Sequence, residues 1–170
     1  MNRNADRPGT GAQSGQPAAT RAALSAVLVE LLDQARREVS VFASVLEADC
    51  FNTARFADSL GQFVARHHTN RACFLVEDGQ QVVRDNARLA ALARRFADAV
   101  QFRRVGEDHR GLRELFMVID SLALVHILDI DRIDAPAPHF RVREATELAR
   151  RFRGMWDMGE PLAEISVTGL

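Results

Sequence analysis

Lysine and tyrosine do not occur in this sequence, and the absence of lysine excludes several kinds of chemistry. All 22 residues counted as lysine or arginine among the 170 are arginines. No Schiff-base lysine, P-loop lysine or lysine general base can therefore operate in the chain. The motifs GxGxxG, GxxxxGK[ST], GxSxG and HExxH are missing as well. We accordingly expect no cofactor.

Cysteine and long apolar runs are also scarce. The two cysteines, Cys50 and Cys73, match no CxxC or zinc-ligand spacing, and the adjacent His67 and His68 point apart on a helix. We therefore predict reduced, buried thiols and no metal site. No segment approaches the ~20 apolar residues of a membrane-spanning helix, and the N-terminus has no signal-like apolar stretch. These absences predict a cytoplasmic protein with no membrane partner.

The charges of the chain are nearly balanced. The formal net charge is −1 and 26% of the residues are charged. Helical segments rich in arginine carry acidic residues too. Such a balance provides no broad positive field, which argues against nucleic acid as a partner.

Helical and strand patterns alternate along the chain. Apolar periodicity predicts helices over 21–37, after an N-cap at Asn52, after an N-cap at Asp85 or Asn86, and over 141–158. Strands are predicted over 39–45, in RACFLVED, in VQFRRV, and in LRELFMVID and LALVHIL, which join at Asp120 and Ser121. The segment EDGQQVVRDN, residues 77–86, is predicted to be a loop. This order predicts an α/β fold with a mixed, mainly parallel sheet, helices on both faces and a terminal antiparallel hairpin.

The composition also predicts where the domain begins and ends. Residues 1–19 are rich in small and polar residues that cannot bury enough surface to offset their ordering entropy, so they predict a disordered N-terminal tail. The α/β domain is predicted over 20–160, and residues 161–170 are predicted to be a C-terminal tail.

The predicted hairpin and the order of elements carry a resemblance to a known fold. RELFMVIDSLALV, residues 113–125, places an aspartate at a tight turn. Together with the element order over about 21–158, this hairpin resembles one half of a phospholipase D-like domain. The run QARREVSVFASVLEADCFNTARFADSLGQFVAR, followed by ACFLVED, is similar to bacterial DUF7931 domains of unknown function. Some of those domains occur alongside GNAT-type acetyltransferases, so the resemblance implies such an enzyme as a partner.

The residues that the phospholipase D-like resemblance assigns to catalysis are missing. Active members carry the motif HxKxxxxD, and with Asp120 as its aspartate the His position is Arg113 and the Lys position is Leu115. The mechanism needs an imidazole to attack phosphorus and an amine to stabilise the developing charge, and neither side chain supplies these. We therefore predict no catalytic residue, a turn-forming role for Asp120, and an inactive interaction or regulatory module.

Two binding hypotheses remain open from the sequence. In a two-residue turn Ile119 pairs with Leu122, which predicts an apolar hairpin face that joins two copies of the chain in a homodimer; its interface residues are Leu115, Met117, Leu122 and Leu124. In the alternative, the chain is a small-anion-binding protein or an enzyme whose remodelled cleft uses Arg84, Arg113 and His126. His126 is otherwise expected to be a half-buried, hydrogen-bonded histidine.

Overall fold

The computed structural model of the chain describes residues 16–133 and 136–165. Its elements, in chain order, are α1 (Gln16–Gln34), β1 (Glu38–Ala43), α2 (Ala48–Phe51), α3 (Ala54–Arg66), β2 (Arg71–Val76), α4 (Gly79–Asp85), α5 (Ala87–Arg95), β3 (Val100–Arg104), the 3-10 helix η1 (Glu107–His109), β4 (Leu115–Ile119), β5 (Ala123–Ile127), α6 (Val142–Asp157) and β6 (Glu160–Pro161). The predicted α/β class is confirmed.

The six strands form one mixed sheet in the order β5-β4-β1-β2-β3-β6. Strand β1 pairs with β2 in parallel, and β2 pairs with β3 in parallel. The pairs β1–β4, β4–β5 and β3–β6 are antiparallel. The prediction of a mainly parallel sheet is therefore wrong, because β4 inserts beside β1 in the opposite direction and β6 returns antiparallel after α6. An apolar pattern marks a strand but does not encode its direction.

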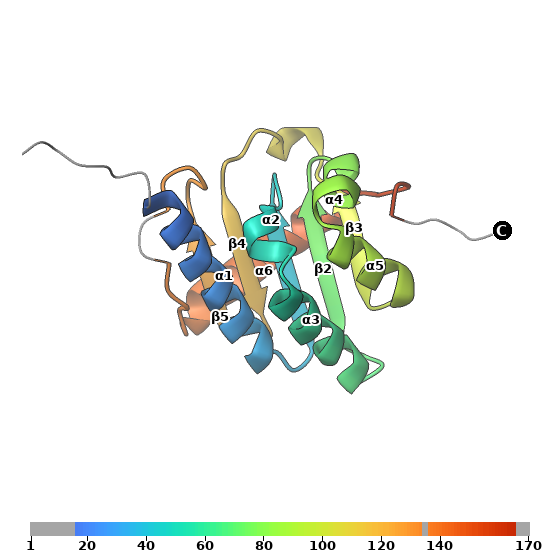
Figure 1. Cartoon of the computed structure of the whole chain (residues 1–170), viewed down its shortest axis with the longest axis horizontal. Coiled ribbons are helices and arrows are strands. Elements are labelled where there is room, and N and C mark those ends of the chain that lie inside the picture. Colours follow the sequence, from blue (N-terminus) through green and yellow to red (C-terminus); the bar gives the residue numbers. More distant parts are fainter. Residues whose placement is uncertain (1–15, 134–135, 166–170) are drawn as a thin grey trace, which may run out of the picture.

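Helices cover both faces of the sheet, as Figure 1 shows, with α1 to α5 on one side and α6 on the other. The core on the first side includes Leu28, Phe56 and Phe74. The core on the second side includes Phe116 and Phe152. The central strands contribute apolar side chains to both cores, which explains why their sequences are nearly continuous apolar runs.

Two helix boundaries differ from the prediction. Helix α3 is capped by Thr53, whose Oγ1 accepts a hydrogen bond from the amide of Phe56 at 3.2 Å, instead of by Asn52. The predicted loop over 77–86 contains α4, where Asp78 Oδ1 accepts from the amide of Gln80 at 2.8 Å. A helix of seven residues makes only two turns, so it is too short to reveal its apolar periodicity.

The hairpin of β4 and β5 exists, but its register is one residue away from the prediction. Ile119 pairs with Ala123 instead of with Leu122. Because side chains alternate across a sheet, this shift moves Leu124 to the opposite face from Leu115 and Met117. Leu124 packs beneath α6. Both residues at the turn, Asp120 and Ser121, have positive φ angles, of 51° and 55°.

The hairpin does not offer the predicted dimer interface. Leu115, Met117 and Leu124 are buried within the chain's own two cores, and Leu122 alone among the four is exposed, at 54%. The three leucine and methionine side chains are buried because helices pack on both sides of this part of the sheet.

The ordered fold extends beyond the predicted boundaries at both ends. Helix α1 begins at Gln16, inside the predicted N-terminal tail. Strand β6 reaches Pro161, and beyond it Leu162 and Ile165 are buried in the core. The remainder of the two predicted tails, residues 1–15 and 166–170, lies outside the described residues. Among the helices that the structure describes, none has the length and apolar character to cross a membrane.

Candidate functional site

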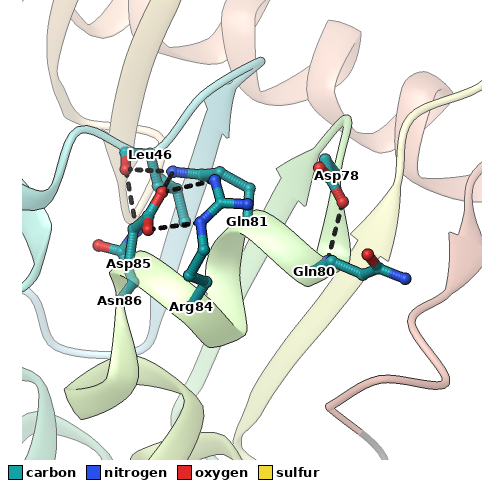
Figure 2. A network of polar contacts seen from close by, with 7 residues as sticks. All are labelled: Leu46, Asp78, Gln80, Gln81, Arg84, Asp85 and Asn86. Carbon is teal, nitrogen blue, oxygen red and sulfur yellow. Dashed lines mark hydrogen bonds and ion pairs between the residues drawn. The ribbon is translucent and has the colours of Figure 1, made fainter.

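The first of the three predicted anion ligands, Arg84, lies on α4 within a local polar network (Figure 2). Its Nε and Nη2 donate to the two carboxylate oxygens of Asp85 at 2.8 and 3.0 Å. This hydrogen bonding holds the pKa of Asp85 below its ordinary value. Gln81 Nε2 and Asn86 Nδ2 both donate to the carbonyl oxygen of Leu46, at 3.2 and 2.9 Å. The network therefore ties α4 to the segment after β1, and Arg84 already has a carboxylate partner.

Arg113 borders a hollow of about 200 Å³ at the carboxyl ends of β1 and β2. This is where ligands gather in open α/β sheets. Arg113 Nε donates to Asp129 Oδ1 at 3.1 Å, and its guanidinium also pairs with Asp131. Across the hollow, Glu77 Oε1 accepts the amide of Gly111 at 2.6 Å. These polar groups satisfy one another, so a ligand here would have to displace existing contacts.

His126 belongs to a third group of residues, between β4, β5 and α6. Its Nε2 lies 2.6 Å from Glu114 Oε1, and its side chain is 27% exposed. The prediction of a half-buried, hydrogen-bonded histidine is confirmed. Arg151 of α6 donates to both carboxylate oxygens of Glu114 at 2.6 Å, and its Cζ lies 5.6 Å from the centre of the Phe116 ring. Sequence reasoning missed Glu114 and Arg151, because 37 residues separate them.

Glu114 is the most buried of the three residues in this cluster. Its side chain is only 12% exposed. Burial alone would raise the pKa of Glu114, but hydrogen bonds from Arg151 and His126 outweigh it, and the pKa lies below its ordinary value. The same contact raises the pKa of Arg151. Glu114 is therefore an anion that holds a cation and a histidine against the sheet.

The structure does not bring the three predicted anion ligands together. Arg113 lines the hollow at the strand ends, whereas His126 lines a hollow against α6 beside Glu144 and Glu147. Arg84 pairs with Asp85 on α4. Since a carboxylate contacts each of the three, this arrangement does not favour the anion site, which stays a prediction.

Asp120 has a structural role at the other end of the hairpin. Its carboxylate accepts the amides of Arg36, Arg37 and Glu38 at 2.8, 2.8 and 2.9 Å. Strand β4 separates it from Arg113 by roughly 20 Å, at ~3.3 Å per residue. The predicted turn role of Asp120 is confirmed, with the added function of holding the connection between α1 and β1.

A fourth region was not predicted from the sequence. A hollow of about 380 Å³ lies where α5, β3, the end of α6 and β6 meet. Its wall includes Arg94, Arg103 and Trp156. Arg103 Nη1 donates to the carbonyl oxygen of Trp156 at 2.7 Å, and its Cζ lies 4.7 Å from the centre of the indole. These two residues are 53 positions apart, so no local pattern could have revealed their contact.

The fold of the chain is similar to those of solved structures that include the following two. TrmBL2, described as an archaeal chromatin protein with a novel mode of DNA binding, matches with a TM-score of 0.61 and 11% identity, over 84% of this chain and 52% of that chain. NucT from Helicobacter pylori matches with a TM-score of 0.53 and 10% identity, over 86% and 94%. The chain thus spans about half the length of TrmBL2. At these identities the likeness establishes the fold alone.

The structural neighbours overturn the expectation that nucleic acid is not a partner. That expectation rested on a net charge of −1, whereas one neighbour with this fold is described as binding DNA. Net charge is a poor guide here because association with a polyanion depends on where the positive charges lie.

The family model gives the most direct assignment. Curated proteins yield no match to this sequence. The model of DUF7931, a domain of unknown function, matches residues 20–167. The predicted resemblance to that family is confirmed, and the chain belongs to the DUF7931 family.

Proposed function

We propose that this chain is a phospholipase D-like domain without catalytic residues, and that it binds nucleic acid without cleaving it. The observation that carries the first part is the state of the two motif positions. Arg113 pairs with two aspartates, Asp129 and Asp131. Leu115 is 1% exposed and belongs to the core.

Neither motif position can serve phosphodiester cleavage. An arginine guanidinium stays protonated in proteins, so Arg113 has no lone pair with which to attack phosphorus. Leu115 cannot stabilise the negative charge that develops on the phosphoryl oxygens. The chain contains no lysine that could replace it.

The cluster around His126 does not replace the lost machinery. A histidine hydrogen-bonded to a carboxylate can act as a general base. Its hollow, however, is lined by Glu144 and Glu147, and these carboxylates would repel a phosphate. Arg151, the cation at this site, already donates to both oxygens of Glu114. The enzymatic alternative is therefore less well supported than the binding function.

Two observations support nucleic acid as the partner. A protein with the same fold is described as a DNA-binding chromatin protein. In addition, the hollow beside Trp156 has two arginines, Arg94 and Arg103, in its wall and, among the residues that the structure describes, no carboxylate. Arginines that are free to contact phosphates supply most of the sequence-independent affinity for nucleic acids.

The test combines a binding assay and a cleavage assay on the purified full-length chain. Fluorescence anisotropy with labelled single-stranded and duplex oligonucleotides should show binding that weakens as salt rises, because binding releases counterions. Gel analysis of the same oligonucleotides should show no cleavage. Cleavage that follows protein concentration and disappears in Arg113→Ala would refute the loss of catalysis. Absence of binding to any oligonucleotide at ~50 mM salt would refute the proposal that nucleic acid is the partner.

A further inference from the structure

The hollow beside Trp156 lies at an incompletely covered edge of the sheet. Strand β6 has only two residues, and it pairs with Arg103 and Arg104 near the end of β3. The first half of β3, at Val100 and Gln101, lies outside this pairing and lines the hollow. Figure 1 shows α5 in front of the sheet beside β3 and α6 behind the sheet. The hollow therefore wraps around a sheet edge and receives side chains from both layers.

The floor and the rim of this hollow differ in chemistry. Val100 and Phe102 are buried and form an apolar floor, and the Phe102 ring stacks on Phe74 with 4.7 Å between ring centres. Arg94 and Gln101 are exposed and supply a polar rim. The volume of about 380 Å³ falls within the range of small-ligand pockets, ~300–1,000 Å³. A ligand that fits must present a flat apolar part and an anionic or hydrogen-bonding part.

Arg103 is held in a fixed orientation by Trp156. The guanidinium lies over the indole at 4.7 Å and donates to the backbone carbonyl of the same residue at 2.7 Å. The indole also stacks on Phe152, with ring centres 5.7 Å apart and planes inclined by 23°. A guanidinium fixed in this way loses little entropy when it binds a ligand, and it presents a planar surface on which a base can stack.

The cations of this hollow have no carboxylate partner within the described part of the chain. Two arginines beside other hollows do have one: Arg113 pairs with Asp129, and Arg151 pairs with Glu114. Arg94 and Arg103 take part in no such pair in the regions 16–133 and 136–165. Arg103 uses one N–H for the carbonyl of Trp156, so most of the five N–H donors of its guanidinium remain for a ligand. An anion can bind here without displacing any protein contact.

We propose that this hollow binds one nucleotide of a single-stranded nucleic acid. The phosphate contacts Arg94 and Arg103, which line the same hollow, and the base lies on the guanidinium plane of Arg103. A base stacked inside a duplex cannot enter such a hollow, whereas an unstacked base can. This inference rests on the proposed nucleic-acid binding and assigns its location and its preference for single strands.

The experiment uses the full-length chain and its own reporter. Trp156 is the single tryptophan of the sequence, and it lines the hollow, so a bound base should change its fluorescence. Titration with a labelled 12-nucleotide single strand is followed by anisotropy and by tryptophan emission. The double variant Arg94→Gln, Arg103→Gln should bind at least ~10-fold more weakly and lose the emission change. Its salt dependence should be shallower by about 1.4, which corresponds to two phosphate contacts on a single strand.

The matched control is Arg55→Gln. Arg55 is an exposed arginine on α3 outside this hollow, and its replacement removes one positive charge, as each single variant of Arg94 or Arg103 does. Its affinity should stay within about twofold of the wild type. Circular dichroism melting of every variant establishes that the fold is retained. If the fold is lost in the double variant, the two single variants and the emission change of the wild type provide the same test.

The outcomes separate this inference from the proposed function. If the wild type binds single strands but the double variant and Arg55→Gln weaken binding equally, nucleic-acid binding stands and the hollow is the wrong place. Tighter binding to a duplex than to the single strand overturns the strand preference. Equal binding to poly-glutamate overturns recognition of a nucleotide. If no oligonucleotide binds at all, both the proposed function and this inference fail.

Discussion

The contacts of Asp120 allow a quantitative prediction about what stabilises the fold. Its carboxylate accepts three backbone amides, those of Arg36, Arg37 and Glu38, at 2.8 to 2.9 Å. Its own φ is 51°, in the left-handed region. One side chain therefore closes the hairpin turn and fixes the connection between α1 and β1. Replacement by alanine removes the three acceptor contacts and places a side chain with no local hydrogen bond in a left-handed conformation.

The expected loss can be worked out from these contacts. A hydrogen bond to a charged group contributes ~1.5–3 kcal/mol when buried, but these amides are exposed, so water recovers part of it and about 1 kcal/mol each is reasonable. The left-handed conformation adds ~1 kcal/mol for alanine. Asp120→Ala should thus lower the free energy of unfolding by about 4 kcal/mol. Asp120→Asn keeps the turn conformation and the Oδ1 acceptor but loses the contact with Arg36, so it should cost about 1 kcal/mol.

Urea unfolding followed by Trp156 fluorescence and by circular dichroism measures both losses. For a chain of this size, about 4 kcal/mol corresponds to a decrease in Tm of ~8–16 °C. Asp108→Ala is the matched control, because Asp108 is an exposed aspartate on η1, and its removal should change stability by less than ~0.5 kcal/mol. If Asp120→Ala lies within ~1 kcal/mol of the wild type, the three contacts do not stabilise the fold and this reasoning is wrong.

Three further predictions concern buried and half-buried groups. Glu114→Gln should lower the free energy of unfolding at pH 7 by about 2 kcal/mol. Because folding lowers the pKa of Glu114, its contribution to stability is present at pH values above the ordinary pKa of 4.5 and is lost as the pH falls through the lowered pKa. Urea titrations should therefore show the free energies of unfolding of the wild type and Glu114→Gln converging below pH 4.5. Burial raises the pKa of Cys50 to about 12 and of Cys73 to about 11, so mass spectrometry should detect little alkylation of native protein by iodoacetamide at pH 8 and full alkylation in urea. Leu115→Lys should destabilise the chain by at least ~3 kcal/mol in thermal melting without creating cleavage, since it buries an unpaired charge.

Local sequence signals were sufficient for much of the architecture. The helix face of Phe56, Leu60 and Phe63 and the continuous apolar run of β2 predicted their elements, because a regular pattern reports which side of an element is buried. Asp120 was recognised as a turn residue because the left-handed conformation depends on the residue itself. Helix α4 escaped prediction, since two turns are too few for a pattern to emerge.

The candidate site depended on contacts between distant residues. Arg103 and Trp156 are 53 residues apart, and Glu114 and Arg151 are 37 apart. The register shift of one residue in the hairpin moved Leu124 from an expected interface into the core beneath α6. Neither these contacts nor the hairpin register can be predicted from residues adjacent in the sequence, because the packing of helices on the sheet determines them.

The sequence by itself determined the chemistry that this protein cannot perform. A chain without lysine can form no lysine Schiff base and has no P-loop lysine in any conformation. Only the tertiary structure decided which arginines have carboxylate partners. Arg113 is paired with nearby carboxylates. Arg103, with an identical side chain, is oriented by an indole and has no carboxylate partner in the described regions. The difference arises because electrostatic and stacking interactions depend on distances that folding alone establishes.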